Sequence, residues 1–190
     1  MAQSLLVGTG LENLFRDVAG RPTVVVNTYE GLVQEVMRLI ELGKKEIHIA
    51  SRYHEPEVSK RLIEKFGKGV ALNIIDGNPT GISLTARLQA ASTSADPATR
   101  AIMKAVLESP RVRIARLSLD YSFIVVDRRY CGFEVVSPLS PHDFKLAVEF
   151  EEEELAQRMV DVFENLWKSG QSPAPADGSG QLATMGARSA

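Results

Sequence analysis

The side chains that most often act as nucleophiles, bases or metal ligands are scarce in this sequence. It contains one cysteine, Cys131, and three histidines, at positions 48, 54 and 142. A single cysteine cannot form an intrachain disulfide, and these histidines lack the spacing to other ligands that zinc sites have. Cys131 lies in a strand-like run without a neighbouring base, so we expect an inert thiol. The sequence therefore predicts no metal site, no cofactor and a reducing compartment such as the cytoplasm.

Polar side chains gather where two strand-like runs end. Ser51, Arg52, Tyr53 and His54 follow one run directly, and Asp76 ends the next. The carboxyl ends of parallel strands form the edge at which open α/β sheets bind ligands. These groups would suit a small neutral polar ligand such as a sugar and would suit a polyphosphate poorly. The alternatives are an ordinary loop role for His54 and a turn-forming role for Asp76.

Arginines concentrate around a later group of strand-like runs, at Arg111, Arg113, Arg116, Arg128 and Arg129. They could form an anion-binding strip, or a solvated sheet edge that discourages aggregation. Arg113 and Arg116 point to opposite faces of a strand because they are an odd number of residues apart. That separation favours the sheet-edge explanation.

Three further features have structural explanations. His48 alternates with apolar residues in a strand that we expect to be covered on both faces, where a histidine with satisfied hydrogen bonds is the usual case. The segment 8–10 imitates a dinucleotide-binding loop, but Asn13 replaces the third glycine. The glutamates at 151–154 open a helix, whose dipole stabilises negative charge there, so this acidic run needs no docking partner.

Length and composition predict one soluble globular domain. Of the 190 residues, 44% are hydrophobic and 24% are charged, which are the usual proportions for such a domain. The net charge of −2 gives no field that would hold duplex DNA or an acidic membrane. The first ten residues lack the features of a secretion signal, and no apolar run approaches the roughly 18 residues of a membrane span.

The chain divides into three segments by composition and periodicity. We expect an N-terminal helical extension over 1–22, with a short helix near Leu11–Val18, and an α/β domain over 23–168. Residues 169–190 are dominated by Gly, Ser, Ala and Pro, which predicts a disordered tail.

Within the domain, apolar periodicity alternates between helix and strand patterns, as is typical of a layered α/β fold. A capping box at Asn27 and Glu30 opens a helix that ends at Gly43, and a tight connection at Arg128–Arg129 predicts a hairpin. Strands joined by helices should be parallel neighbours. The expected strands are Thr23–Val26, Glu46–Ala50, Val70–Ile75, Val112–Ser118, Tyr121–Asp127, Tyr130–Val136 and Phe144–Phe150, and the further helices are Glu55–Phe66, Pro97–Glu108 and Glu151–Trp167, with partial helix between Thr80 and Pro97.

The order of these elements, together with several phrases, resembles a phospholipase D-like unit over residues 24–168. The phrases are Lys44–Ser51, Glu57–Phe66 and Gly67–Val70 in the first half, and Ser122–Asp127, Gly132–Val135 and Phe163–Trp167 in the second. The effector-binding part of TrmB-type archaeal transcriptional regulators, which has no catalytic motif, is the more similar version. The resemblance implies a single phospholipase D-like α/β unit with a mixed sheet and helices on both of its faces.

The enzymes of this superfamily carry the motif His-x-Lys-x-x-x-x-Asp, in which the imidazole attacks phosphorus and the lysine neutralises phosphoryl charge. Aligned on Asp127, this chain has Asp120 in the histidine position and Ser122 in the lysine position. A carboxylate would repel a phosphodiester, and a serine supplies no positive charge. The resemblance thus implies a protein without catalytic residues.

We therefore expect a non-catalytic ligand-sensing or regulatory domain that binds a small polar molecule near Ser51–His54 and Asp120–Ser122. Single units of this kind commonly pair, so a homodimer is expected by analogy. The related regulators carry a helix-turn-helix domain ahead of the unit, whereas only residues 1–23 precede it here. Regulation would then act through a DNA-binding partner protein and not by direct binding of duplex DNA.

Two other functions stay open. An atypical phosphodiesterase or nuclease could use Asp120 and Asp127 as a carboxylate pair with a divalent metal. Positions an odd number of residues apart face opposite sides of a strand, which disfavours that pair. A pure protein-interaction module without any small ligand would fit the same sequence.

Overall fold

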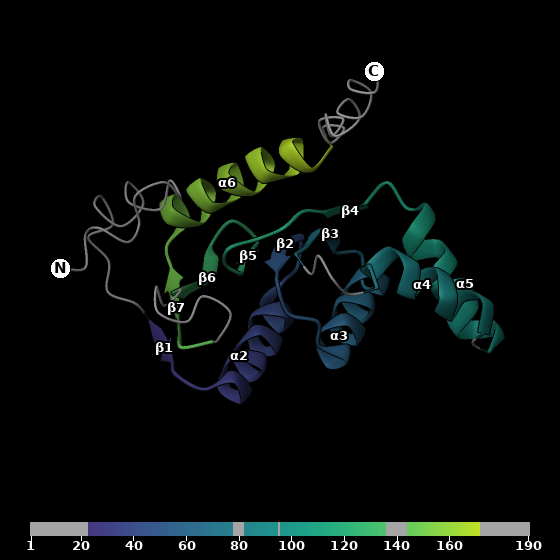
Figure 1. The fold of residues 1–190 in the computed structure, drawn as a ribbon, viewed down its shortest axis with the longest axis horizontal. Coiled ribbons are helices and arrows are strands. Elements are labelled where there is room, and N and C mark those ends of the chain that lie inside the picture. The colour runs from purple at the N-terminus through teal and green to yellow at the C-terminus, as the bar shows by residue number, and fades with distance from the viewer. Residues whose placement is uncertain (1–22, 78–81, 95, 136–143, 172–190) are drawn as a thin grey trace, which may run out of the picture.

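The computed structural model describes residues 23–77, 82–94, 96–135 and 144–171, and within them seven strands form one mixed sheet that five helices flank (Figure 1). The strands are β1 (Val24–Val26), β2 (Glu46–Ser51), β3 (Ala71–Asp76), β4 (Val112–Arg116), β5 (Phe123–Val126), β6 (Tyr130–Val135) and β7 (Leu146–Glu151). The helices are α2 (Tyr29–Leu42), α3 (Pro56–Gly67), α4 (Leu84–Ser94), α5 (Pro97–Glu108) and α6 (Glu153–Gln171). The predictions for a helix at 11–18, a loop at 8–10 and a tail beyond residue 171 lie outside the described residues.

The strands are ordered β1-β7-β6-β5-β2-β3-β4. The strands β2, β3 and β4 are parallel, as the helices between them predict. The strands β5, β6, β7 and β1 continue the sheet in antiparallel pairs. The predicted α/β architecture, a mixed sheet covered by helices on both faces, is confirmed (Figure 1).

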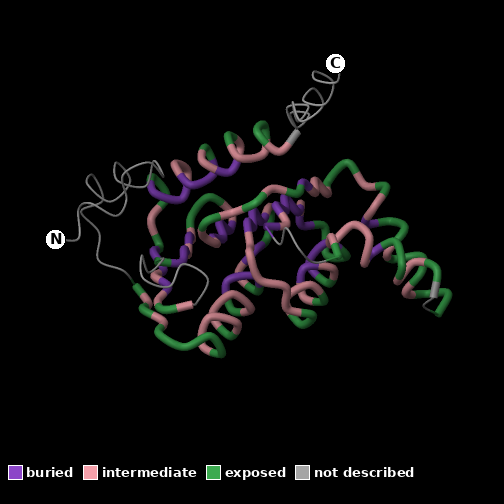
Figure 2. The backbone as a smooth tube through the Cα atoms, in the orientation of Figure 1, coloured by how far each residue is buried: buried purple, intermediate pink, exposed green. Residues whose placement is uncertain are grey.

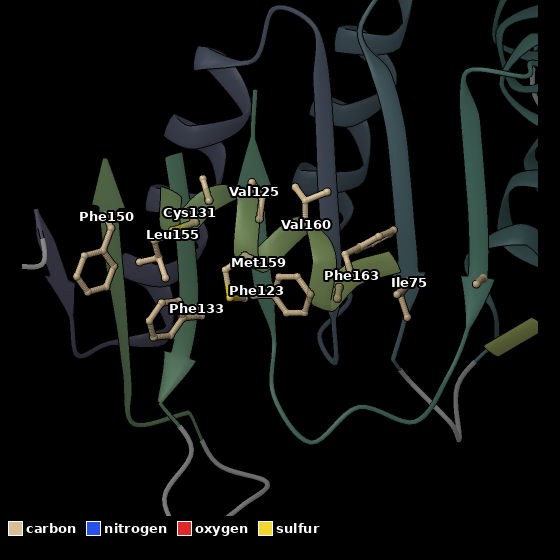
Figure 3. Packing of buried hydrophobic residues seen from close by; sticks show 13 residues of the cluster. Ile75, Phe123, Val125, Cys131, Phe133, Phe150, Leu155, Met159, Val160 and Phe163 are labelled. Carbon is tan, nitrogen blue, oxygen red and sulfur yellow. The ribbon is translucent and has the colours of Figure 1, made fainter. Parts of the chain in front are cut away.

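One face of the sheet packs against α6. Phe123 and Val125 of β5 and Phe133 of β6 form a core with Met159 and Phe163 of α6 (Figure 3). Both of these α6 side chains are fully buried. Apolar residues recur every three to four positions along α6, and this spacing gives the helix the apolar stripe that covers the sheet.

The other face packs against α2 and α3, with α4 and α5 beside them. Leu39 and Ile40 of α2, Leu62 of α3 and Ile49 of β2 belong to this second core. Successive strand residues point to opposite faces, so the neighbouring Ala50 joins the α6 side instead. The central strands are therefore buried on both faces, and the buried segments in Figure 2 gather in the sheet and on the helix sides that face it.

The first helix of the domain begins later than the sequence pattern predicts. The side chain of Thr28, and not that of Asn27, caps α2 by accepting a hydrogen bond from the Gly31 amide, because the first helical residue is Tyr29. In the second half of the sheet, β4 and β5 are also shorter than predicted. Residues 117–122 form the loop that leads from one of these strands to the other.

The last helix, α6, also begins later than the sequence predicts. It starts at Glu153, so two glutamates and not four lie in its first turn. Glu151 instead ends β7 and forms an ion pair with Arg129 at 2.6 Å. At its other end α6 runs to Gln171, so residues 169–171 of the predicted tail are helical.

The turn between β5 and β6 is built from Asp127 and Arg128, one residue earlier than the predicted Arg128–Arg129 connection. Both have a positive φ, of 53° and 55°, as the two central residues of a type I′ turn do, and the Arg129 amide closes this turn by donating to the Val126 carbonyl at 3.0 Å. The Asp127 carboxylate accepts hydrogen bonds of 2.8 to 3.0 Å from three successive backbone amides, those of residues 44–46. The aspartate that aligns with the phosphotransfer motif therefore ties the hairpin to the start of β2.

Candidate functional site

A pocket of about 110 Å³ lies between the sheet and the helices α2 and α3. Part of its floor is a row of polar residues at one edge of the sheet. Ser51 and Asp76 are paired in register at the carboxyl ends of β2 and β3. Ser122, just before β5, accepts a backbone hydrogen bond of 2.8 Å from Glu134 of β6. All four residues line the pocket, on the face that α2 and α3 cover.

Five of the seven residues predicted for the site line this pocket. They are Ser51, Tyr53, His54, Asp76 and Ser122, whereas Arg52 and Asp120 lie outside the lining. The interior is mainly hydrocarbon and includes Leu32, Val36, Leu39, Val58, Leu62 and Ile124. The structure thus brings most of the predicted polar groups to the rim and floor of an apolar cavity.

Glu134 organises one wall of the pocket. Its side chain is 1% exposed, and its Oε1 receives hydrogen bonds from the Arg52 guanidinium and the Tyr53 hydroxyl, both at 2.5 Å. Its Oε2 receives one from the Ser122 amide at 3.1 Å. The Arg52 amide donates in turn to the Ser122 hydroxyl at 3.0 Å. This network fixes the positions of Tyr53 and Ser122 in the pocket wall.

Two tyrosines stand at the rim. The rings of Tyr29 and Tyr53 meet edge to face with centroids 5.2 Å apart, and the Tyr29 hydroxyl donates to Glu55 at 2.6 Å. Burial and the neighbouring carboxylates raise the pKa of both hydroxyls, that of Tyr53 to about 12. Both phenols therefore stay protonated and act as hydrogen-bond donors at physiological pH.

The remaining polar residues of the floor have local partners as well. Asp76 accepts a hydrogen bond from the Leu84 amide at 2.7 Å, which positions the start of α4. Ser51 exchanges two hydrogen bonds of 3.0 Å with the backbone of Tyr53. Burial, together with Arg87, lowers the pKa of His54. Its imidazole is therefore neutral near pH 7 and can both donate and accept a hydrogen bond.

The positions that align with the phosphotransfer motif do not meet at one site. Asp120 is exposed in the loop before β5, and Ser122 is bonded to the Arg52 amide. Asp127 lies beyond the other end of β5, against the start of β2. The four residues of β5 lie between Asp120 and Asp127, and at about 3.3 Å of rise per residue this strand alone spans more than about 10 Å. The two aspartates are too distant to share a metal ion or a phosphodiester.

A second ionisable cluster lies where α2 crosses β7. Glu149 of β7 is 3% exposed, and Arg38 of α2 donates to its Oε1 at 2.5 Å and to Glu35 at 2.6 Å. The Arg38 guanidinium thus links the two carboxyl groups. Burial and Glu35 raise the pKa of Glu149 to about 7, whereas hydrogen bonds outweigh burial and lower the pKa of Glu35. Near neutral pH the pair therefore holds a proton part of the time.

The pocket is acidic in character. Among the described residues that line it none is lysine or arginine, whereas five carry carboxyl groups, namely Glu35, Glu55, Asp76, Glu134 and Glu149. Arg38 and Arg52 contact three of these groups but are not part of the lining. The surface offers hydrogen-bond acceptors and hydrocarbon to a ligand, and it would repel a phosphate.

The arginines considered for an anion-binding strip have other contacts. Arg113 forms a bidentate ion pair with Glu164 of α6, at 2.9 and 3.0 Å. Arg128 and Arg129 pair with the glutamates at positions 46 and 151. Arg111 lies over a phenylalanine ring, 4.7 Å from its centroid. These side chains stabilise the fold, and they do not converge on an anion site.

His48 and Cys131 lie on the α6 side of the sheet, away from the pocket. The His48 ring is 2% exposed and meets the Phe163 ring edge-on at 5.0 Å. Burial lowers its pKa, so the ring is neutral. Its Nδ1 finds no hydrogen-bond partner among the described residues, which corrects the expectation of a fully satisfied histidine. Burial raises the pKa of the Cys131 thiol to about 12, so this thiol stays protonated.

Sequence reasoning missed the other ionisable residues of the lining, namely Tyr29, Glu35, Glu55, Glu134 and Glu149. Glu134 and Glu149 did carry a signal. Each is a glutamate inside a predicted strand of a sheet that was expected to have helices on both faces, and a carboxylate buried there requires partners. The other three lie on α2 or just before α3, where only the packing of the helices decides which residues border a cavity.

In the part of the chain that the structure describes, no three His, Cys, Asp or Glu side chains come together as a metal site would require. Nor is any helix in those segments both long and apolar enough to cross a lipid bilayer.

The sheet order and the helices on its two faces define a phospholipase D-like fold. TrmBL2, an archaeal chromatin protein with a novel mode of DNA binding, has a similar structure, with a TM-score of 0.61 and 15% identity over 88% of this chain and 59% of that one. NucT from Helicobacter pylori is also similar in structure, with a TM-score of 0.55 and 8% identity over 77% of this chain and 95% of that one. For Nuc from Salmonella typhimurium, a phospholipase D family member, the TM-score is 0.53 and the identity is 16%, over 80% of this chain and 97% of that one. No protein-family model and no curated protein matches the sequence.

These likenesses concern the fold. The chain spans 59% of the length of TrmBL2, and all three identities are at or below 16%. The predicted resemblance to phospholipase D-like units and to TrmB-type proteins is confirmed at this level.

Proposed function

We propose that this chain is a non-catalytic ligand-sensing domain, which binds one small molecule in the pocket between α2, α3 and the sheet. The observation that carries the proposal is the pocket itself, with a hydrocarbon interior, donors and acceptors at its rim and no lysine or arginine among the described lining residues. Such a cavity fits a small molecule that is uncharged or positively charged and partly apolar.

The alternative, phosphodiester cleavage, finds little support in the same residues. The group that would attack phosphorus is replaced by Asp120, which is exposed and outside the pocket. The position of the cationic group is occupied by Ser122, whose hydroxyl accepts a hydrogen bond from the Arg52 amide. Stabilisation of a phosphoryl transition state requires preorganised positive charge at the reacting atoms, and the described pocket lining supplies none.

The pocket is well placed to transmit a signal. Its walls come from α2, α3 and six strands, namely β1, β2, β3, β5, β6 and β7, so a bound ligand would add contacts among all of these elements. The receiver would be a second copy of the chain or a DNA-binding partner in the cytoplasm. The similarity in fold to TrmBL2, a protein described as binding DNA, supports that context.

A thermal-shift screen of sugars, amines, nucleotides and amino acids tests the proposal. We expect one class without negative charge to raise the melting temperature by several degrees, because a ligand that binds only the folded state stabilises it. Gly132→Ala should weaken the effect: a Cβ there would lie 3.4 Å from Leu39, an ordinary contact that keeps the fold and narrows the pocket. Asp120→Ala is the matched control outside the lining and should bind normally.

Two outcomes would overturn the proposal. One is the absence of any stabilising compound in the whole screen. The other is metal-dependent turnover of bis-p-nitrophenyl phosphate that Asp120→Ala abolishes, since this would place chemistry at the motif positions.

A further inference from the structure

A buried carboxyl oxygen without a hydrogen-bond partner marks one end of the pocket. Glu149 lines the cavity and is 3% exposed. Its Oε1 is held by Arg38, but its Oε2 is buried and has no hydrogen-bond partner among the described residues. Leaving a buried acceptor unsatisfied is unfavourable, and more so when the acceptor is charged. Such an oxygen requires either a proton of its own or a hydrogen-bond donor from a ligand.

The pocket also reaches the strand position beside this carboxyl group. Gly132 of β6 pairs in register with Glu149 and also lines the cavity. It has no side chain, and the nearest atom to a Cβ built there would be Leu39 Cδ1, at 3.4 Å. Leu39 and Ile124 border the same cavity. The carboxyl group therefore borders the part of the cavity that Leu39 and Ile124 also border.

We propose, on the basis of the ligand-binding function above, that the ligand is a primary amine with a short apolar body whose ammonium group binds between Glu149 and Glu35. Its hydrocarbon part lies against Leu39, Ile124 and the neighbouring aliphatic side chains. Binding is a proton exchange. The pair releases the proton that it holds, and the ammonium N–H groups take over as donors to the oxygens.

The charge balance favours a cation. The charged groups that face Glu149 are Glu35 and Arg38, both from α2. The neighbouring strands place Val24 and Gly132 at the paired positions, which adds no charge. On the α6 side, Cys131 remains protonated. One guanidinium thus serves two carboxyl groups, so the deprotonated pair has one excess negative charge, which an ammonium neutralises.

Other ligand classes fit this end of the pocket less well. An anion would meet the carboxyl pair and the further acidic lining residues, with no cation in the described lining to offset them. A hydroxyl group could donate one hydrogen bond to Glu149, but it would not balance the charge of the deprotonated pair. A guanidinium is planar and larger, and Arg38 already occupies the side from which it would approach.

Isothermal titration with straight-chain amines from propylamine to hexylamine, and with the alcohols of the same lengths, tests this inference. At pH 7 we expect at least one amine to bind ten or more times more tightly than its alcohol. Parallel titrations in phosphate and in MOPS buffer, which differ in ionisation enthalpy, should reveal release of a fraction of a proton. Glu149→Gln should weaken amine binding at least tenfold and abolish that release. Glu35→Gln, a second variant at the rim, should also abolish it, while Glu164→Gln on the α6 side should change neither.

The outcomes separate this inference from the ligand-binding function. If alcohols bind as tightly as amines and Glu149→Gln has no effect, the pocket binds ligands but the amine is the wrong class. If neither series binds, the amine inference also fails, and the thermal-shift screen then decides alone whether the pocket takes another ligand.

Discussion

Replacement of Glu134 by alanine is expected to lower the free energy of unfolding by about 3–5 kcal/mol. The Glu134 side chain is 1% exposed and that of Arg52 is 12% exposed, with 2.5 Å between them. Truncation leaves the guanidinium buried without this carboxylate, and the hydroxyl of Tyr53 and the amide of Ser122 also lose their acceptor. A buried guanidinium that has lost its carboxylate is much less favourable than one in an ion pair, which accounts for the size of the effect.

Urea unfolding monitored by circular dichroism measures this loss. Glu164→Ala is the control, because Glu164 also forms a close ion pair with an arginine but is 35% exposed, and exposed pairs contribute about 0.2–1 kcal/mol. The double replacement Arg52→Met with Glu134→Leu should recover most of the stability, since it removes both charges. A Glu134→Ala variant that is no less stable than the control would show that the network does not hold the pocket wall.

The second large effect concerns pH. Relative to Glu149→Gln, the wild-type protein should lose about 2–3 kcal/mol of stability between about pH 4.5 and pH 7.5. The pKa of Glu149 is raised from 4.5 to about 7 in the folded state, so the folded protein holds this proton more tightly than the unfolded chain does. That stabilisation is fully present below pH 4.5 and is lost as the pH rises through 7. Each pKa unit corresponds to about 1.4 kcal/mol, and coupling to Glu35 reduces the total.

Chemical unfolding of both proteins at a series of pH values gives the difference directly. Groups that titrate in both proteins contribute equally and drop out of the difference. One such group is His48, whose lowered pKa makes stability fall as the pH decreases, opposite to the effect of Glu149. A difference between the two proteins that stays constant over this range would mean that Glu149 titrates normally and that the pair holds no proton near neutral pH.

Much of the fold could be predicted from the sequence, because hydrophobic periodicity reports local structure directly. Apolar residues spaced along one face identified α2, α3 and α6, and β-branched runs identified the central strands. Element ends were less predictable. Asn27 and Thr28 are both good capping residues, and only the packing of α2 decides that the helix begins after Thr28.

The site was harder to predict, because it depends on strand register. The sequence indicated that Ser51 and Asp76 end parallel strands, and the two residues are indeed paired. It did not indicate that the β5–β6 hairpin places Glu134 beside Ser122. A shift of one residue in the pairing of these strands would turn the Glu134 side chain to the α6 face. The alignment on Asp127 drew attention to Asp120, whereas the structure uses Asp127 to close a hairpin turn and leaves Asp120 exposed.

The pocket offers hydrocarbon and hydrogen-bond acceptors to a ligand. On one wall, the Glu134 carboxylate binds an arginine, a tyrosine and a backbone amide. We therefore expect this surface to recognise a small molecule and not to stabilise a phosphoryl transition state.

The central claim is that this pocket, and not the set of positions aligned with the phosphotransfer motif, is the functional centre. Mapping of backbone amide shifts by two-dimensional NMR, during titration with the compound that stabilises the protein most, tests it most directly. We predict saturable shifts at Ser51, Tyr53, Gly132, Glu134 and Glu149, with residues 127–129 of the hairpin turn unchanged. Shifts centred on that turn, on the exposed loop at 117–121 or on the outer edges of β1 and β4, with the pocket residues unmoved, would contradict it.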